Sequence, residues 1–135
     1  TVLIDSGTAV TEQVAAGQDQ CGSAGDISHP RLHMVEPLSY LEFNYLVERA
    51  KAVVTDSGGI TEEASIMRVP CMTLRDNTER PETITLGTNE LLGTDPKAIK
   101  PAMNKLFAGE WKQGNDIPLW DGKAAERIVE ELLKM

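Results

Sequence analysis

Residues 52–64 constrain the fold of this chain more than any other segment. Four mostly β-favouring residues, Ala-Val-Val-Thr, lead into Asp-Ser-Gly-Gly at 56–59, and a helix-forming run follows. This order predicts a strand, a tight turn and a helix N-terminus. Because Gly58 and Gly59 carry no Cβ, a diphosphate can approach the backbone there, and the helix dipole favours an anion. An ordinary strand-to-helix turn with no ligand is the alternative interpretation.

Two acidic residues follow the glycines, and we expect both on the first turn of the predicted helix. Glu62 and Glu63 are favoured there by the helix dipole. They would also lie about one nucleoside length from a phosphate bound at the glycines. The sequence therefore indicates a place where ribose hydroxyls could be bound.

The remainder of the chain alternates short β-favouring segments with helical periodicity, which predicts an α/β domain. We expect a three-layer, Rossmann-like parallel sheet flanked by helices. A helix should begin after Ser39 as N-cap, with Phe43 on its apolar face as either a core or a pocket residue. Further strands are expected at 31–35, 71–74 and within 86–93, and further helices after Asp95 and after Gly122.

Residues 1–28 form an atypical N-terminal segment before a domain that spans 29–135. Val-Leu-Ile at 2–4 precedes Asp-Ser-Gly-Thr-Ala at 5–9, and we expect a helix-like run through Val10, Val14 and Ala15. This predicts a βα-like unit, which the polar, glycine-containing residues 18–28 extend as a loop.

A second loop brings positive charge toward the glycines. Arg75 and Arg80 follow the strand predicted at 71–74. Because parallel α/β sheets bind ligands at the carboxyl ends of their strands, this loop should lie beside residues 56–59. The two guanidinium groups would suit a diphosphate. Alternatively, they pair on a solvated loop with their acidic neighbours Asp76, Glu79 and Glu82.

Charge and composition argue against several classes of protein. The chain has 135 residues and a net charge of −8, and its basic residues form no long run, so a nucleic-acid or anionic-membrane surface is not expected. No apolar run reaches the roughly 20 residues that span a bilayer, and we expect a cytoplasmic protein. Cys21 and Cys71 lie far apart, and Pro30 separates His29 from His33, so we expect neither a metal nor a cofactor.

Several motifs in order resemble the signature of the non-hydrolysing UDP-N-acetylglucosamine 2-epimerases. The resemblance covers His29 to about Leu133. Its flanks are Glu-Pro-Leu-Ser-Tyr-Leu-Glu-Phe at 36–43 and Trp-Asp-Gly-Lys-Ala-Ala-Glu-Arg-Ile at 120–128. The central motifs are Asp-Ser-Gly-Gly-Ile-Thr-Glu-Glu-Ala at 56–64, Val-Pro at 69–70, Leu-Arg at 74–75, Thr-Glu-Arg-Pro-Glu at 78–82 and Gly-Thr-Asn at 87–89.

The resemblance implies a two-domain fold like that of GT-B glycosyltransferases, with UDP bound mainly by the C-terminal domain, to which this chain is similar. UDP-GlcNAc or UDP is the implied ligand. Carried over position by position, the family's contacts to the diphosphate fall at Ser57, Gly58 and Gly59, and its contact to the phosphates falls at Arg80. The contact to the ribose falls at Glu63 and the contact to the uracil at Phe43.

The implied reaction converts UDP-GlcNAc to UDP-ManNAc by anti elimination of UDP to a 2-acetamidoglucal, followed by re-addition on the other face. Carboxylates move the C2 proton, and cationic and amide donors stabilise the departing UDP. In the family these carboxylates lie on the N-terminal domain, so the catalytic residues of this chain are unknown. A non-catalytic UDP-binding module and a fragment of a GT-B glycosyltransferase are the alternatives. Sequence does not give the oligomeric state, and a homodimer is one option.

Overall fold

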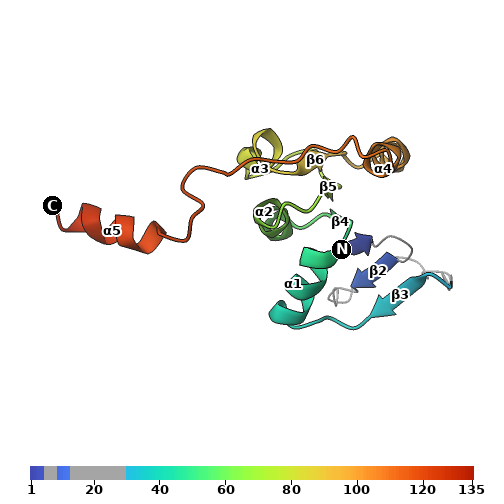
Figure 1. The fold of residues 1–135 in the computed structure, drawn as a ribbon, viewed down its shortest axis with the longest axis horizontal. Helices are drawn as coiled ribbons and strands as arrows, with labels where there is room; N and C mark the ends of the chain where they lie inside the picture. The colour runs from blue at the N-terminus through green and yellow to red at the C-terminus, as the bar shows by residue number, and fades with distance from the viewer. Residues whose placement is uncertain (5–8, 13–29) are drawn as a thin grey trace.

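The computed structural model describes residues 1–4, 9–12 and 30–135 (Figure 1). Within them, one mixed sheet has the strand order β3-β2-β1-β4-β5-β6. Its strands are β1 (Val2–Ile4), β2 (Ala9–Glu12), β3 (Leu32–Val35), β4 (Ala52–Thr55), β5 (Cys71–Thr73) and β6 (Asn89–Leu91). The helices are α1 (Tyr40–Arg49), α2 (Gly58–Ile66), α3 (Pro81–Thr85), the 3-10 helix η1 (Pro96–Ala98), α4 (Ile99–Phe107) and α5 (Ala124–Leu132).

The predicted parallel sheet is confirmed for β4, β5 and β6, which run parallel, and β2 and β3 are parallel to each other. β1 departs from the prediction, because it is antiparallel to both β2 and β4. Residues 5–8 alone connect β1 to β2, whereas a parallel crossover needs a dozen or more residues. The site-bearing half of the sheet is therefore the parallel half.

The helix-like run expected through Val10 is wrong, because Ala9–Glu12 is strand β2. The two strands together form a hairpin in place of the predicted βα-like unit. The other residues of that expectation, Val14 and Ala15, and the loop at 18–28 lie outside the described residues.

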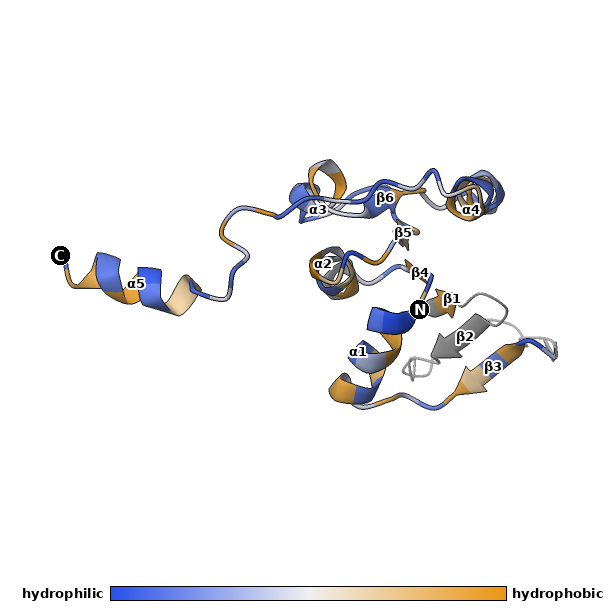
Figure 2. Ribbon diagram, in the orientation of Figure 1, coloured by the Kyte–Doolittle hydropathy of each residue, from blue (hydrophilic) through white to orange (hydrophobic). Residues whose placement is uncertain are grey.

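Apolar side chains of the sheet alternate between two cores, which makes the expected three layers. β4 is buried along its whole length, because helices cover both of its faces. On one face, α1 and α2 pack on the sheet, with a core of Leu3, Phe43, Val47, Val53, Ala64, Val69 and Cys71. On the other, α4 packs on the sheet, with a core of Ile4, Ala52, Val54, Met72, Ala102, Leu106 and Trp111. Figure 2 shows hydrophobic residues along β1 and β3 and on parts of the helices.

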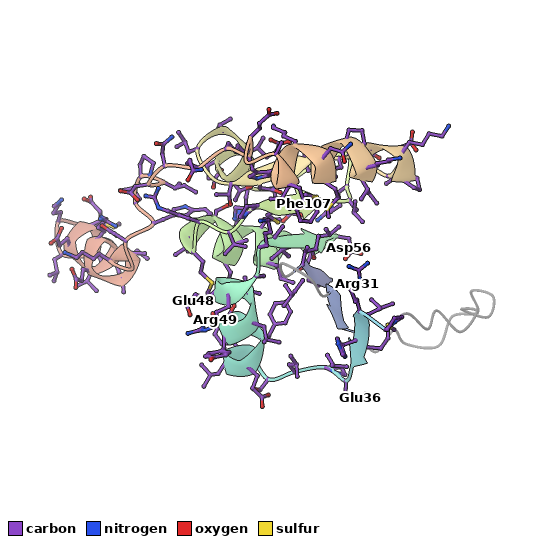
Figure 3. The ribbon with its side chains drawn as sticks, turned by 45° about the vertical axis from the view of Figure 1, so that its right-hand side comes forward. Arg31, Glu36, Glu48, Arg49, Asp56 and Phe107 are labelled. Atoms are coloured by element: carbon purple, nitrogen blue, oxygen red, sulfur yellow. The ribbon has the colours of Figure 1, made fainter. Side chains whose placement is uncertain are left out.

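Helix α1 begins where the sequence predicted. The Ser39 side chain accepts a hydrogen bond from the Glu42 N–H, and the Glu42 carboxylate accepts one from the Ser39 N–H at 3.0 Å. This reciprocal capping box satisfies two N–H groups that the helix itself leaves without partners. Glu48 and Arg49 form an exposed ion pair of 2.6 Å at the other end of α1, on the side away from β3 (Figure 3).

Helix α5 stands apart from the sheet at the end of the chain (Figure 1). None of its residues is buried. Its apolar residues, including Ile128, Val129 and Leu132, are more than half exposed. The amphipathic pattern thus predicts the helix correctly, but the apolar face of the helix does not pack on this domain. Among the described residues, no helix is both long enough and apolar enough to cross a bilayer.

Candidate functional site

The carboxyl ends of the parallel strands bring two loops to one edge of the sheet. The Leu74 N–H donates to the Thr55 carbonyl at 2.8 Å, and the Leu92 N–H donates to the Thr73 carbonyl at 2.9 Å. β4, β5 and β6 therefore end side by side, and Asp56 lies at the end of β4 (Figure 3). This is the edge at which parallel α/β sheets bind ligands.

The N-terminus of α2 is not capped by any side chain. Ser57 occupies the N-cap position, but its hydroxyl makes no capping bond. Its N–H donates instead to Thr55 Oγ1 at 3.0 Å, and that oxygen lies 2.9 Å from Thr1 Oγ1. The amides of Gly58 and Gly59, in the first turn, have no acceptor within the helix. Two backbone donors and the positive end of the helix dipole are thus left for an anion.

The space around the two glycines is open on one side and lined by a cation on the other. A Cβ placed on Gly58 would lie 3.7 Å from Arg75 Nη1, and a Cβ placed on Gly59 would meet nothing within 4 Å. Arg75 is half-buried and has no ion pair with any residue that the structure describes. The predicted adjacency of the two loops is therefore confirmed at Gly58 and Arg75.

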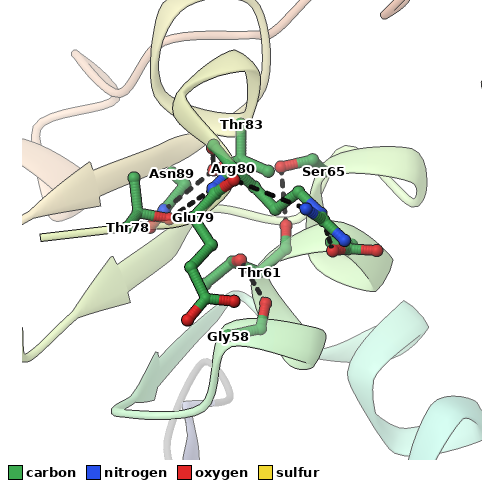
Figure 4. Close-up of polar contacts among 9 residues, drawn as sticks. Gly58, Thr61, Ser65, Thr78, Glu79, Arg80, Thr83 and Asn89 are labelled. Atoms are coloured by element: carbon green, nitrogen blue, oxygen red, sulfur yellow. Dashed lines mark hydrogen bonds and ion pairs between the residues drawn. The ribbon is translucent and has the colours of Figure 1, made fainter.

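Arg80 reaches back over α2 from the loop that follows β5 (Figure 4). Its Nε donates to Glu62 Oε1 at 2.5 Å, with the two side chains 49% and 36% exposed. This hydrogen bond and the charge of Glu62 raise the pKa of Arg80, and the nearby charges of Glu82 and Glu79 raise it further. The alternative interpretation named acidic neighbours on the same loop as partners. The ion pair forms instead with a residue 18 positions earlier on α2.

A buried chain of hydrogen bonds fixes the loop that carries Arg80, and Figure 4 shows its members Asn89, Thr83 and Arg80. Thr73 Oγ1 donates to Asn89 Oδ1 at 2.6 Å, and Asn89 Nδ2 donates to Thr83 Oγ1 at 3.2 Å. Thr83 Oγ1 in turn donates to the Arg80 carbonyl at 2.7 Å. The side chains of Thr73, Thr83 and Asn89 are at most 1% exposed. Sequence reasoning assigned no structural role to these three residues, because their pairing depends on the register of β5 against β6.

Gly87 allows α2 to approach the end of α3. A Cβ at this position would lie 2.6 Å from Ser65 Oγ and 2.6 Å from the Thr83 carbonyl oxygen. Ser65 Oγ donates to the Thr61 carbonyl at 2.7 Å, and Thr61 Oγ1 donates to the Gly58 carbonyl at 2.6 Å. Close packing at Gly87 therefore supports the helix whose first turn forms the site.

The structure corrects the expected position of two acidic residues and decides the role of Phe43. Glu62 and Glu63 lie on the second turn of α2, not the first, because the helix begins at Gly58 itself. Glu63 is half-buried there. Phe43 is a core residue: it is 8% exposed and belongs to the cluster with Val47 and Ala64. Its side chain therefore offers little surface on which a base could stack.

Metal-ligating residues do not gather in the part of the chain that is described, where no three His, Cys, Asp or Glu side chains form a group that could hold a metal ion. Cys71 is a free, buried thiol, and burial raises its pKa to about 12. A thiol of this kind is a poor nucleophile at neutral pH. Cys21 and His29 lie outside the described residues.

Known proteins resemble this chain over most of its length. The model of the family described as UDP-N-acetylglucosamine 2-epimerase matches residues 9–133. The chain belongs to this family. It is 46% identical over 106 residues to the UDP-N-acetylglucosamine 2-epimerase of Methanocaldococcus jannaschii. The aligned residues make up 76% of this chain and 27% of the relative. The Bacillus subtilis enzyme of the same name is 41% identical over 107 residues, which is 76% of this chain and 28% of the relative.

Solved structures of the UDP-N-acetylglucosamine 2-epimerase family share the fold. The M. jannaschii UDP-GlcNAc 2-epimerase in complex with UDP-GlcNAc and UDP superposes with a TM-score of 0.69 at 42% identity, over 80% of this chain and 29% of that one. The Neisseria meningitidis enzyme bound to UDP-GlcNAc gives 0.68 at 37% identity, over 78% and 29%. The described domain therefore has the architecture of one part of a GT-B-type epimerase, and it spans less than a third of those chains.

Proposed function

We propose that this chain supplies the UDP-binding domain of a UDP-N-acetylglucosamine 2-epimerase, with residues 29–135 as the nucleotide-sugar-binding unit and 1–28 as an atypical segment before it. The observation that carries the proposal is the uncapped start of α2 beside a guanidinium group, in a chain that belongs to this family. Relatives at 37–42% identity were solved with UDP-GlcNAc or UDP bound.

The proposed binding mode follows from the groups at this edge of the sheet. The free amides of Gly58 and Gly59 donate to the diphosphate, and the Ser57 hydroxyl, which makes no capping bond, is available to do the same. Arg80 adds positive charge from the next loop. Glu63, one turn along α2, accepts hydrogen bonds from the ribose hydroxyls. The uracil lies against α1 at Phe43.

In the complete enzyme the proposed reaction inverts C2 of UDP-GlcNAc to give UDP-ManNAc. The residues of this domain hold UDP while its bond to the sugar breaks and re-forms, and their amide and cationic donors stabilise the negative charge that develops on the leaving diphosphate. The carboxylates that move the C2 proton would come from the N-terminal part of the family's fold. The protein acts in the cytoplasm, with no nucleic-acid or membrane partner, and a homodimer is compatible with this role.

Calorimetric titration of the 135-residue chain with UDP tests the proposal. We expect binding in the micromolar to millimolar range, with adenosine diphosphate as the control ligand that binds more weakly. A chain that does not bind UDP at millimolar concentration would refute the proposed function.

A second experiment separates binding from catalysis. Incubation of the chain with UDP-GlcNAc in deuterated water labels C2 only if a group removes and returns that proton. We expect UDP-GlcNAc to bind without deuterium appearing at C2, because the proposed acid and base groups are not among the residues of this site. Incorporation of deuterium would show that this chain carries its own acid and base.

A further inference from the structure

We propose that Arg75 is the principal cation for the diphosphate, and that Arg80 contributes less because Glu62 shares its charge. The inference rests on the proposed function and assigns different contributions to the two arginines of that site. Both arginines lie on the loop after β5, so the sequence gives no reason to rank them. Their partners in the folded chain differ, and this difference ranks them.

Arg75 meets the helix N-terminus directly. Its Nη1 lies 3.7 Å from the position of a Cβ on Gly58, the residue at which α2 begins. The side chain is half-buried and has no ion pair with another described residue. A guanidinium that no carboxylate pairs with, and that is partly removed from water, attracts an anion more strongly than a paired and solvated one.

Arg80 is surrounded by acidic groups. It donates to Glu62 at 2.5 Å, and Glu79 and Glu82 also act on its pKa. An incoming diphosphate must compete with Glu62 for the Arg80 guanidinium and meets the field of these carboxylates. The pair lies at the fifth residue of α2, about 6 Å along the helix axis from Gly58. Arg80 therefore pairs with a residue one turn beyond the free amides, and it carries less uncompensated charge than Arg75.

Glu62 then acts as a positioning residue. Its carboxylate holds the Arg80 side chain over α2, beside the half-buried Glu63 that we assign to the ribose. Replacing it with glutamine keeps a hydrogen-bond acceptor for Arg80 and removes one negative charge near the ligand. We expect Glu62→Gln to bind UDP more tightly by about two- to fivefold at low salt, with a smaller gain at high salt, since salt screens exposed charges.

The experiment compares four variants of the full chain by calorimetric titration with UDP. Arg75→Ala should weaken binding by about tenfold or more, the range for a lost hydrogen bond to a charged group. Arg80→Ala should weaken it by a smaller factor. Arg75→Lys should recover part of the loss because it keeps the charge. Arg68→Ala is the matched control, because Arg68 pairs with Asp116 at 2.6 Å beyond the other end of α2, and it should leave the affinity unchanged.

Two further readouts exclude a merely structural role for Arg75. The unfolding midpoint of Arg75→Ala should match that of Arg68→Ala. Uridine, which lacks phosphate, should bind Arg75→Ala and the unaltered chain equally in an NMR titration. The inference is overturned if Arg75→Ala binds UDP within twofold of the unaltered chain, if Arg80→Ala is the weaker binder, or if uridine affinity falls in parallel. Absence of UDP binding by the unaltered chain would instead refute the proposed function, and this inference with it.

Discussion

Replacement of Asn89 should test whether the buried hydrogen-bond chain holds the site together. Asn89→Ala removes the bond that accepts from Thr73 Oγ1 and the bond that donates to Thr83 Oγ1. A neutral hydrogen bond contributes about 1 kcal/mol net, and a buried polar group left without a partner costs about 1–3 kcal/mol. Thr83 keeps its bond to the Arg80 carbonyl, so the Thr73 hydroxyl is the group that loses the acceptor of its 2.6 Å bond.

The sum for Asn89→Ala is a loss of about 2–4 kcal/mol in the free energy of unfolding. Urea denaturation followed by tryptophan fluorescence measures it, because Trp111 is 6% exposed and donates to the Thr88 carbonyl beside Asn89. Asn89→Leu, which fills the space but restores no hydrogen bond, should recover only the part of the loss due to the cavity. Asn77→Ala, at an exposed position on the loop after β5, is the control and should change the free energy by less than about 0.5 kcal/mol.

UDP affinity should fall together with stability in Asn89→Ala. The Thr83 side chain and its N–H both donate to the Arg80 carbonyl, so loosening Thr83 loosens the loop that carries Arg80. A loss in unfolding free energy below about 1 kcal/mol would contradict the reasoning, because it would mean that Thr73 and Thr83 find other partners at little cost.

Four further predictions concern other parts of the molecule. Gly87→Ala should destabilise the chain by about 1–3 kcal/mol because its Cβ would meet Ser65 and backbone at 2.6 Å. Gly59→Ala should instead raise the unfolding free energy by up to about 1 kcal/mol yet weaken UDP binding; equal stability effects in the two glycine variants would refute this. The hydrogen bond from Arg127 lowers the pKa of Asp121 to about 2. The contribution of this hydrogen bond to the free energy of unfolding is therefore complete above about pH 4 and is lost as the pH falls toward 2. An NMR titration of Arg127→Ala should find the pKa of Asp121 raised. An unchanged pKa would assign the shift to another cause. Ending the chain after residue 122 removes α5 and should change the unfolding free energy by less than about 0.5 kcal/mol, since none of its residues is buried; a larger loss would show that α5 packs on the domain.

Local sequence determined the elements that present the site. The β-favouring run before Asp-Ser-Gly-Gly makes β4, and the helix-forming run after it makes α2. Ser39 and Asp95 mark the starts of α1 and η1 through hydrogen bonds from their side chains to backbone N–H groups. These features depend on residues a few positions apart, so the chain specifies them before it is folded.

Tertiary structure decided how the elements meet. The sequence offered Arg80 three acidic neighbours on its own loop, yet the folded chain pairs it with Glu62 on α2. It offered no reason to join Thr73 to Asn89, which lie 16 positions apart and meet through the register of β5 against β6. The orientation of β1 and the exposure of α5 are likewise absent from local patterns. Hydrogen bonds and ion pairs between distant residues depend on which surfaces the cores bring together, and that is fixed only when the sheet and its helices have packed.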